Sequence, residues 1–96
     1  MTKPRVTITY CTKCRFMLRA TWLAQELLTT FGEDLGEVAI VPGSGGIFEV
    51  TLNDEVVASN KLDKTLPEPG AVKRAIRDRI APDKKIGHEV DHEDVT

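Results

Sequence analysis

The sequence has 96 residues, of which 41% are hydrophobic and 29% are charged. This length predicts one domain, and this composition is typical of a soluble globular protein. Thirteen basic and fifteen acidic residues give a net charge of −2, so charge gives no reason to expect nucleic acid or an anionic membrane as the main partner. The sequence shows neither the ~20-residue apolar run of a membrane helix nor a secretory signal, so we expect a cytoplasmic protein.

The first predicted elements are a strand and a long helix. In residues 5–10, large apolar side chains alternate with threonines, which predicts a strand. Residues 14–31 change to helical spacing, and Gly32 stands at the expected end of the helix. Its expected buried stripe comprises Phe16, Met17, Ala20, Leu23, Ala24, Leu27, Leu28 and Phe31. We expect partial burial of Trp22 at the polar edge of this stripe, whereas an exposed Trp22 would suggest a docking surface.

Three further strands are expected after this helix. Residues 37–41 form a short apolar strand, and a loop with three glycines follows at residues 42–46. Residues 47–52 and 55–59 flank Asn53-Asp54, which is the pattern of a tight antiparallel hairpin.

The last predicted helix covers residues 71–80, after a loop at residues 60–70, and ends before Pro82. Val72, Ala75, Ile76 and Ile80 form its buried face, and Lys73, Arg74, Arg77 and Arg79 are expected mostly to face solvent. We therefore predict a domain at residues 1–82. The charged residues 83–96 are expected to form a tail that is either mobile or docked.

The elements follow one another in the order β-α-β-β-β-α. A strand-helix-strand unit favours two parallel strands with a right-handed crossover, and the hairpin adds two antiparallel strands. Both helices must bury their apolar stripes on the sheet. We therefore predict an α+β, two-layer fold with a four-stranded mixed sheet, in the order of thioredoxin-like domains. Element order alone leaves other α+β sandwiches open.

The two cysteines, Cys11 and Cys14, form a Cys-x-x-Cys motif between the first strand and the first helix. Residues three apart on a helical turn have Cβ atoms about 5–6 Å apart, close to the range that a disulfide requires. A helix start stabilises a thiolate, and comparable motifs lower the cysteine pKa from about 8.5 toward about 7. On this geometry Cys11 is exposed and attacks first, Cys14 lies further inside, and Lys13 tunes the pKa.

Other roles for the cysteine pair are open on the residues alone. A structural disulfide would close a four-residue loop and constrain little, and a reducing compartment disfavours it. A zinc site needs four ligands, and the other candidates, His88 and His92, lie far downstream in the expected tail. The cysteines could also pack in the core as free thiols. We favour a redox pair and expect no bound metal.

Several segments together resemble the selenoprotein W/T/H-related (Rdx) redox family over about residues 5–80. They are Tyr10-Cys11-x-x-Cys14, the loop Gly43-Ser44-Gly45-Gly46, the strand Phe48-Glu49-Val50 and the turn Asn53-Asp54. The resemblance implies a thioredoxin-like fold and a redox role. Animal relatives carry selenocysteine at the position of Cys14, which favours Cys14 as the attacking residue and implies slower chemistry in this all-sulfur chain.

Thioredoxin-like domains also place a proline, usually cis, beside the cysteines where the first hairpin strand begins. Pro42 is the candidate for this position. We hypothesise that the loop lies next to Cys11 and receives an extended substrate or glutathione, because its glycines permit close backbone approach. The expected loop residues are Pro42, Gly43, Ser44, Gly45 and Gly46. An ordinary flexible turn is the alternative.

The leading hypothesis is a small thiol–disulfide oxidoreductase acting on a protein disulfide or on glutathione, with glutathione as co-substrate and no bound cofactor. One alternative is a non-catalytic interaction module in which the cysteine pair senses redox state. A glutaredoxin-like protein is another alternative, although Thr12 stands where glutaredoxins normally have proline. A homodimer is expected to be possible through the tail or a sheet edge.

Overall fold

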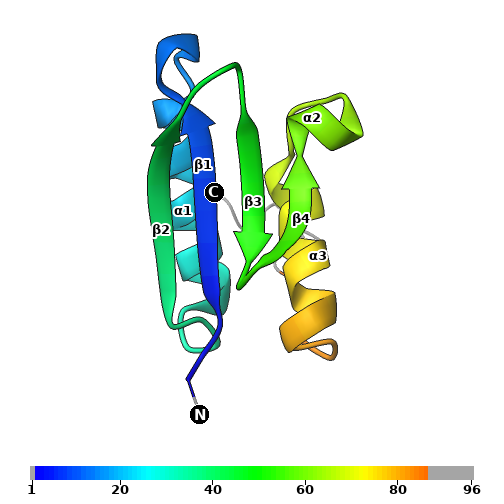
Figure 1. Cartoon of the computed structure of the whole chain (residues 1–96). Coiled ribbons are helices and arrows are strands. Elements are labelled where there is room, and N and C mark those ends of the chain that lie inside the picture. The colour runs from blue at the N-terminus through cyan, green and yellow to red at the C-terminus, as the bar shows by residue number, and fades with distance from the viewer. Residues whose placement is uncertain (1, 87–96) are drawn as a thin grey trace, which may run out of the picture.

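A four-stranded mixed sheet forms one layer of the fold, and two helices cover one of its faces (Figure 1). The computed structural model describes residues 2–86. In the sheet order β2-β1-β3-β4, the strands are β1 (Arg5–Cys11), β2 (Glu37–Gly43), β3 (Phe48–Leu52) and β4 (Glu55–Ser59). The helical segments are the 3-10 turn η1 (Thr12–Cys14), α1 (Met17–Phe31), the short α2 (Asn60–Asp63) and α3 (Pro69–Ile80). The predicted α+β class and the β-α-β-β-β-α order are confirmed.

Strand β1 lies inside the sheet and determines the register on both sides. It pairs in parallel with β2, which places Cys11 opposite Gly43, and α1 makes the crossover between these two strands. It pairs antiparallel with β3, which places Tyr10 opposite Phe48. The Asn53-Asp54 turn then returns the chain into β4, as the hairpin pattern predicts. The carboxyl end of β1 therefore meets the end of β2 and the start of β3.

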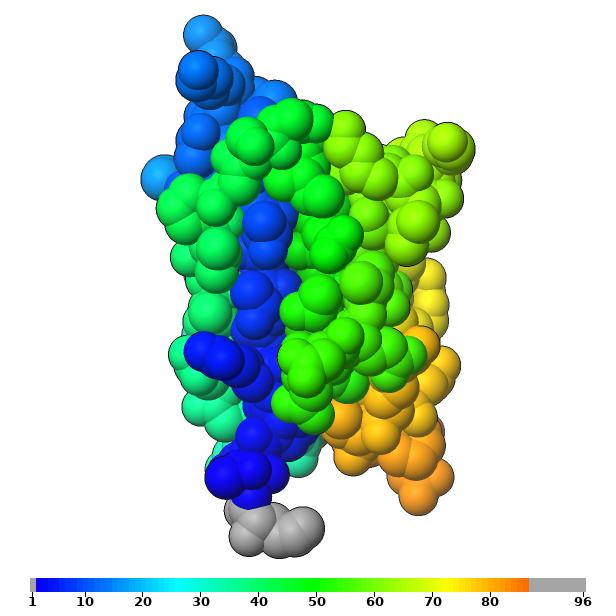
Figure 2. Space-filling model, viewed as in Figure 1, coloured from blue at the N-terminus to red at the C-terminus, as the bar shows by residue number. Residues whose placement is uncertain are grey.

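The core lies between the sheet and the two long helices. Alternate residues of β1 and β3 point into it, as the period of two predicts, and α1 and α3 supply the other side. Its fully buried members include Val6, Ile8, Leu27, Phe31, Phe48, Val50, Val72 and Ile76. The opposite face of the sheet, which Figure 2 shows in space-filling form, carries partly exposed threonines such as Thr7 and Thr9. No helix among residues 2–86 covers that face.

The apolar stripe expected on α1 is wider than the stripe that the structure buries. Ala20, Leu23, Ala24, Leu27 and Phe31 are buried. Met17 and Leu28, which were expected inside, are exposed, and Trp22 retains 48% of its surface. The sheet contacts one side of the helix, so apolar residues beyond that side stay in solvent.

Lys73 is the exception among the basic residues of α3, which were expected mostly to face solvent. Its side chain is buried, and its Nζ lies 2.8 Å from Oε1 of Glu26 on α1. A long lysine side chain can bury its methylene groups along an apolar surface, and a nearby carboxylate then pairs with its charge. The ion pair joins the two helices that cover the sheet.

The segment after β4 is more ordered than a loop. Residues 60–70 contain α2, and α3 begins at Pro69 rather than residue 71, because proline is compatible with the first turn of a helix. Lys84 pairs with Asp34 at 3.3 Å, and Ile86 is fully buried. The rest of the expected tail, with His88 and His92, lies outside the described residues. Within residues 2–86, no helix is both long enough and apolar enough to span a membrane.

Candidate functional site

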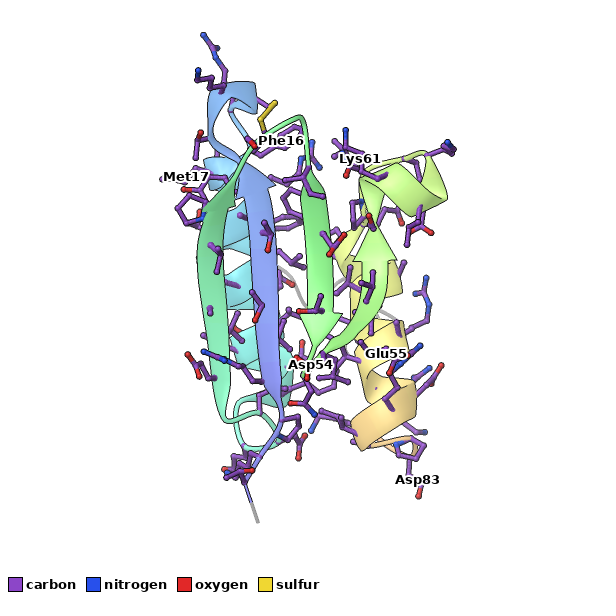
Figure 3. The ribbon with its side chains drawn as sticks, in the orientation of Figure 1. Phe16, Met17, Asp54, Glu55, Lys61 and Asp83 are labelled. Carbon is purple, nitrogen blue, oxygen red and sulfur yellow. A yellow bond between two sulfur atoms is a disulfide. The ribbon has the colours of Figure 1, made fainter. Side chains whose placement is uncertain are left out.

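The two cysteines lie at the carboxyl end of β1 and are joined by a disulfide (Figure 3). Cys11 is the last residue of β1, and Cys14 is the last residue of η1. Their Cα atoms are 5.4 Å apart, within the usual range for a disulfide. The 3-10 turn η1 reverses the chain direction within three residues, and this brings the sulfur of Cys14 to the sulfur of Cys11.

The expected exposure of the two cysteines is wrong. Cys11 is buried, with 3% of its surface exposed, and Cys14 is partly exposed. Cys11 continues the strand, and its backbone N–H donates a 2.8 Å hydrogen bond to the carbonyl of Ile47. Cys14 lies in the turn that leaves the sheet. A reagent in solution therefore meets Cys14 before Cys11.

The long helix begins later than the periodicity indicates. Arg15 adopts φ 61° and ψ 33°, which interrupts helical geometry after η1, and α1 starts at Met17 instead of residue 14. Neither cysteine therefore lies in the first turn of α1. The positive charges beside the pair come from Lys13 and Arg15, which are both exposed and flank Cys14 in sequence. Such charges favour a thiolate over a thiol.

The glycine-rich loop lies next to Cys11. Gly43 is the register partner of Cys11, and a Cβ atom at Gly43 would lie 2.9 Å from side-chain carbons of both Thr9 and Ile47. Gly45 and Gly46 have φ of 71° and 75°, a region that glycine adopts without strain. The backbone then reaches Ile47, which accepts the hydrogen bond from Cys11. A role of this loop in binding a substrate stays a prediction.

Pro42 does not stand where we expected it. It lies within β2, opposite Tyr10, and it is exposed. The chain needs the whole of the following loop before β3 begins at Phe48. All peptide bonds in the described part of the chain are trans. The backbone groups beside Cys11 are those of Gly43 and Ile47 instead.

The short helix α2, which stands where a loop was expected, holds the glycine-rich loop in place. The side chain of Asn60 accepts a 2.8 Å hydrogen bond from the backbone N–H of Phe48 and donates one of 2.6 Å to the carbonyl of Gly46. The ammonium of Lys61 donates to the carbonyl of Gly45 at 2.6 Å. Figure 3 shows Lys61 at the same end of the sheet as the disulfide. Ser59 caps α2, and a Ser-Asn pair after a strand is the signal that could have found it.

Replacing Asn60 with alanine is expected to loosen the loop. Both loop contacts of the amide are lost, and the partly buried Phe48 N–H and Gly46 carbonyl lose their partner. The expected cost is about 1–3 kcal/mol of unfolding free energy. Urea unfolding measures it, and amide hydrogen exchange at Gly46 and Phe48 locates it.

Lys61→Ala is the matched control for Asn60→Ala. It also removes a hydrogen bond to the loop, but that bond is exposed to solvent, so we expect a loss of less than about 1 kcal/mol. Equal losses for the two variants would contradict the positioning role of Asn60.

An aromatic contact ties the segment after the cysteines to the core. The rings of Phe16 and Phe48 meet edge to face, with centroids 5.7 Å apart and an interplanar angle of 79°. Phe48 is fully buried on β3, and Phe16 is partly buried just before α1. Figure 3 shows Phe16 at the same end of the sheet as the disulfide. The backbone that follows Cys14 is thus anchored on the first residue of β3.

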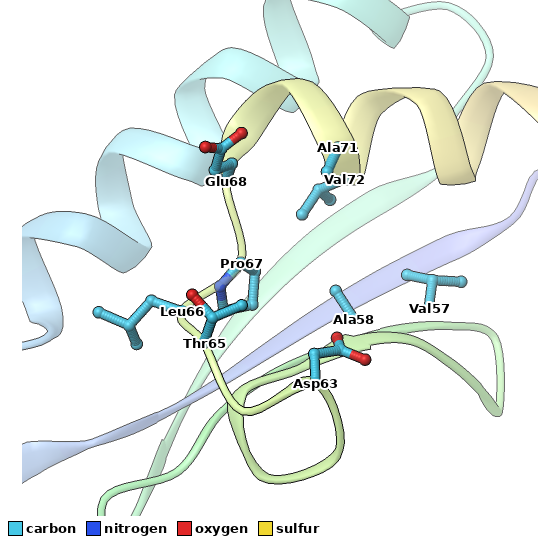
Figure 4. Close-up of a pocket in the computed structure, with 9 residues that line it drawn as sticks. All are labelled: Val57, Ala58, Asp63, Thr65, Leu66, Pro67, Glu68, Ala71 and Val72. Carbon is cyan, nitrogen blue, oxygen red and sulfur yellow. The ribbon is translucent and has the colours of Figure 1, made fainter.

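A pocket of about 330 Å³ lies between β4, the segment after α2 and the start of α3, away from the cysteines (Figure 4). Its polar groups include Asp63, whose carboxylate already accepts a hydrogen bond from the backbone N–H of Ser59. It contains no cysteine or histidine, so it offers no redox chemistry. Within the part of the chain that the structure describes, no cluster of three or more metal-ligating side chains occurs.

A two-layer α+β fold with a disulfide-bonded Cys-x-x-Cys at the carboxyl end of its first strand defines a thioredoxin-like protein of the CxxC class. More specifically, the chain belongs to the Rdx family, whose model matches residues 5–78. A comparison with curated protein sequences finds no match.

Two crystal structures support this assignment. A protein from Bordetella parapertussis is 49% identical, with a TM-score of 0.79 over 81% of this chain and 99% of that one. A selenoprotein W-related protein from Vibrio cholerae is 40% identical, with a TM-score of 0.77 over 80% of this chain and 96% of that one. Both likenesses extend over nearly the full length of the other protein, so they concern the whole fold.

Proposed function

We propose that this protein is a thiol–disulfide oxidoreductase in which Cys14 attacks the substrate and Cys11 resolves the mixed disulfide. The observation that carries the proposal is the unequal exposure of two sulfurs that are close enough to bond. Cys11 is 3% exposed and Cys14 is partly open to solvent, while their Cα atoms are 5.4 Å apart. An accessible thiolate with a buried partner in reach is the arrangement that such exchange requires.

The reaction begins with both cysteines reduced. The Cys14 thiolate attacks one sulfur of a substrate disulfide, forms a mixed disulfide with it, and releases the other substrate sulfur as a thiolate. The Cys11 thiol gives up its proton to solvent and attacks the Cys14 Sγ, which forms the Cys11–Cys14 disulfide and releases the second substrate thiolate. Two electrons pass from the protein to the substrate.

Return to the reduced state requires a thiol reductant. Two molecules of a monothiol such as glutathione, or one protein dithiol, can supply the two electrons. The first reductant sulfur attacks the sulfur of Cys14, because Cys14 is more exposed than Cys11. The substrate class is therefore a disulfide-bonded protein or peptide, and glutathione is a candidate co-substrate. These exchanges suit the reducing, cytoplasmic setting expected from the sequence.

A redox titration tests the proposal. The protein is equilibrated in glutathione buffers from about −180 to −280 mV, its free thiols are alkylated, and the alkyl groups are counted by mass spectrometry. We expect one two-electron transition, from a reduced protein with two free thiols to an oxidised protein with no free thiol. A pair that stays reduced across this range would refute the redox role.

Turnover then separates an oxidoreductase from a redox-sensing module. With excess glutathione and glutathione reductase, an oxidoreductase reduces hydroxyethyl disulfide many times per protein molecule, as NADPH consumption records. A sensor is oxidised once and stops. We expect repeated turnover, and a single stoichiometric burst would favour the sensor.

A further inference from the structure

Large apolar side chains gather on the exposed side of the first turns of α1. Leu18 keeps 80% of its surface exposed, Met17 keeps 56%, and Trp22 keeps 48%. Leu18 and Trp22 are four residues apart, so they are neighbours on one side of the helix. We call Leu18 and Trp22, with Arg15 and Arg19, the α1 ridge. Figure 2 shows the chain after β1 protruding beyond the end of the sheet, where a partner can reach it.

The residues of the α1 ridge line a hollow in the surface, and their two arginines give it a positive charge. A surface hollow of about 520 Å³ is lined by Arg15, Leu18, Arg19 and Trp22. Arg15, Arg19 and the nearby Lys13 are exposed, and none of the ion pairs among residues 2–86 includes them. The sequence has no acidic residue before Glu26, and that carboxylate is engaged by Lys73. A strongly basic, apolar surface therefore stands on a chain whose net charge is −2.

The ridge begins at the residue that follows the cysteine pair. Arg15 follows Cys14 directly, and the sulfur of Cys14 is the more accessible of the two. The contact of Phe16 with Phe48 anchors the backbone between Cys14 and α1 to the core. A segment that occupies the hollow contacts Arg15, the residue next to Cys14, so a sulfur just beyond the hollow can reach Cys14.

We infer that the α1 ridge docks the disulfide-bearing protein that Cys14 reduces, through a segment with an apolar side chain between Leu18 and Trp22 and carboxylates that pair with Lys13, Arg15 and Arg19. Charge complementarity selects this occupant, because Arg15 and Arg19 line an apolar hollow and Lys13 precedes Arg15 by two residues. No carboxylate within residues 2–86 pairs with any of these three cations. A second copy of the chain is a poor fit, since a two-fold contact would place the same cations opposite each other. The inference rests on the proposed function, whose exchange chemistry it leaves unchanged.

Docking is measured first without chemistry. Trp22 is the single tryptophan of the chain, so its fluorescence reports directly on the ridge. The titrant is a short peptide with leucine beside serine, the serine replacing cysteine, and with aspartate and glutamate on both sides. We expect a saturable change in Trp22 emission with this peptide, and a response at least about tenfold weaker with the same peptide carrying lysines.

The same peptides with cysteine in place of serine test the link to catalysis. Their cysteine carries thionitrobenzoate as a mixed disulfide, so its release is followed by absorbance. For each protein variant, the rate with a peptide is divided by the rate with hydroxyethyl disulfide, which is uncharged. This ratio removes any general change in the reactivity of Cys14. We expect reduced wild-type protein to prefer the acidic peptide over the basic one by about tenfold.

Two variants and a matched control locate the effect. Arg15→Glu with Arg19→Glu is expected to abolish or reverse the charge preference, and Leu18→Ala with Trp22→Phe is expected to lower the acidic-peptide ratio by about five- to tenfold. Lys3→Glu with Lys85→Glu changes the net charge by the same amount at exposed positions away from the ridge. We expect this control to keep the wild-type preference.

Three outcomes separate the two proposals. A charge preference that persists in Arg15→Glu/Arg19→Glu, or is lost equally in the control, would overturn the docking surface. A Trp22 response to phosphatidylserine vesicles and none to the acidic peptide would overturn it in favour of a lipid surface. Saturable binding of the serine peptide by a protein that reduces no disulfide would refute the oxidoreductase and leave the docking surface standing.

Discussion

Replacing Cys14 with serine is expected to abolish mixed-disulfide formation, whereas replacing Cys11 is expected to trap it. The accessible sulfur is lost in Cys14→Ser, and the remaining cysteine, Cys11, is the last residue of β1 and has 3% of its surface exposed. We expect the reaction with a small disulfide to slow by at least about two orders of magnitude. Quenched-flow alkylation with mass detection of the adduct measures it.

Cys11→Ser is the matched control, because it removes the same disulfide bond and the same number of thiols. Its Cys14 thiolate should still attack, and the adduct should accumulate because no second thiol resolves it. Neither variant should turn over repeatedly through an internal disulfide. Faster adduct formation on Cys11 in Cys14→Ser than on Cys14 in Cys11→Ser would reverse the proposed roles.

Phe48→Ala is expected to cause the largest loss of stability of the variants considered, about 3–5 kcal/mol. Phe48 is fully buried on β3, pairs with Tyr10 in the register, and meets the ring of Phe16. Truncation leaves a cavity where the glycine loop, the segment after the cysteines and the core meet. Urea unfolding followed by circular dichroism measures the change in unfolding free energy.

A conservative variant keeps this prediction testable if Phe48→Ala does not fold. Phe48→Leu retains most of the buried volume and loses the edge-to-face contact, so we expect a cost of about 1–2 kcal/mol. Leu62→Ala removes a side chain of α2 that is 69% exposed and should change the stability by less than about 0.5 kcal/mol. A Phe48→Leu cost equal to that of Leu62→Ala would contradict the anchoring role of Phe48.

The order of the elements and the pairing of the two cysteines could be predicted because their signals are local. Alternation with a period of two identified β1 and β3, and Asn53-Asp54 identified the hairpin. Spacing of the cysteines by three residues predicted that they could bond, and the structure holds them in a disulfide. Pleating, tight turns and short disulfide loops all depend on residues close together in the chain.

The start of α1 could not be predicted from periodicity. The apolar spacing continues back to Phe16, yet Arg15 has a positive φ and ends the helical geometry before Met17. Arginine is not a residue that favours this conformation, so residue type gives no warning of it. The turn at residues 12–15 connects two fixed positions: Cys11 at the end of the sheet and Phe16, whose ring contacts Phe48.

The width of the buried stripe on α1 also could not be predicted from the sequence. Spacing identifies which residues share a side of a helix, but the sheet and α3 decide how far around the helix contact extends. Met17 and Trp22 fall outside that contact and stay exposed, and Trp22 lines the hollow of the proposed docking surface. Lys73 is the opposite case, because a partner on another helix, Glu26, makes its burial possible.

The sequence by itself determined the strands, the hairpin, the approximate helices and the presence of a cysteine pair able to form a short disulfide, since each depends on neighbouring residues. Only the tertiary structure decided which sulfur faces solvent. Cys11 belongs to the sheet, because its amide pairs with the carbonyl of Ile47 and Gly43 lies opposite it on β2, and its side chain is buried there. These partners are more than thirty residues away along the chain, so no local pattern around Cys11 and Cys14 could distinguish the exposed sulfur from the buried one.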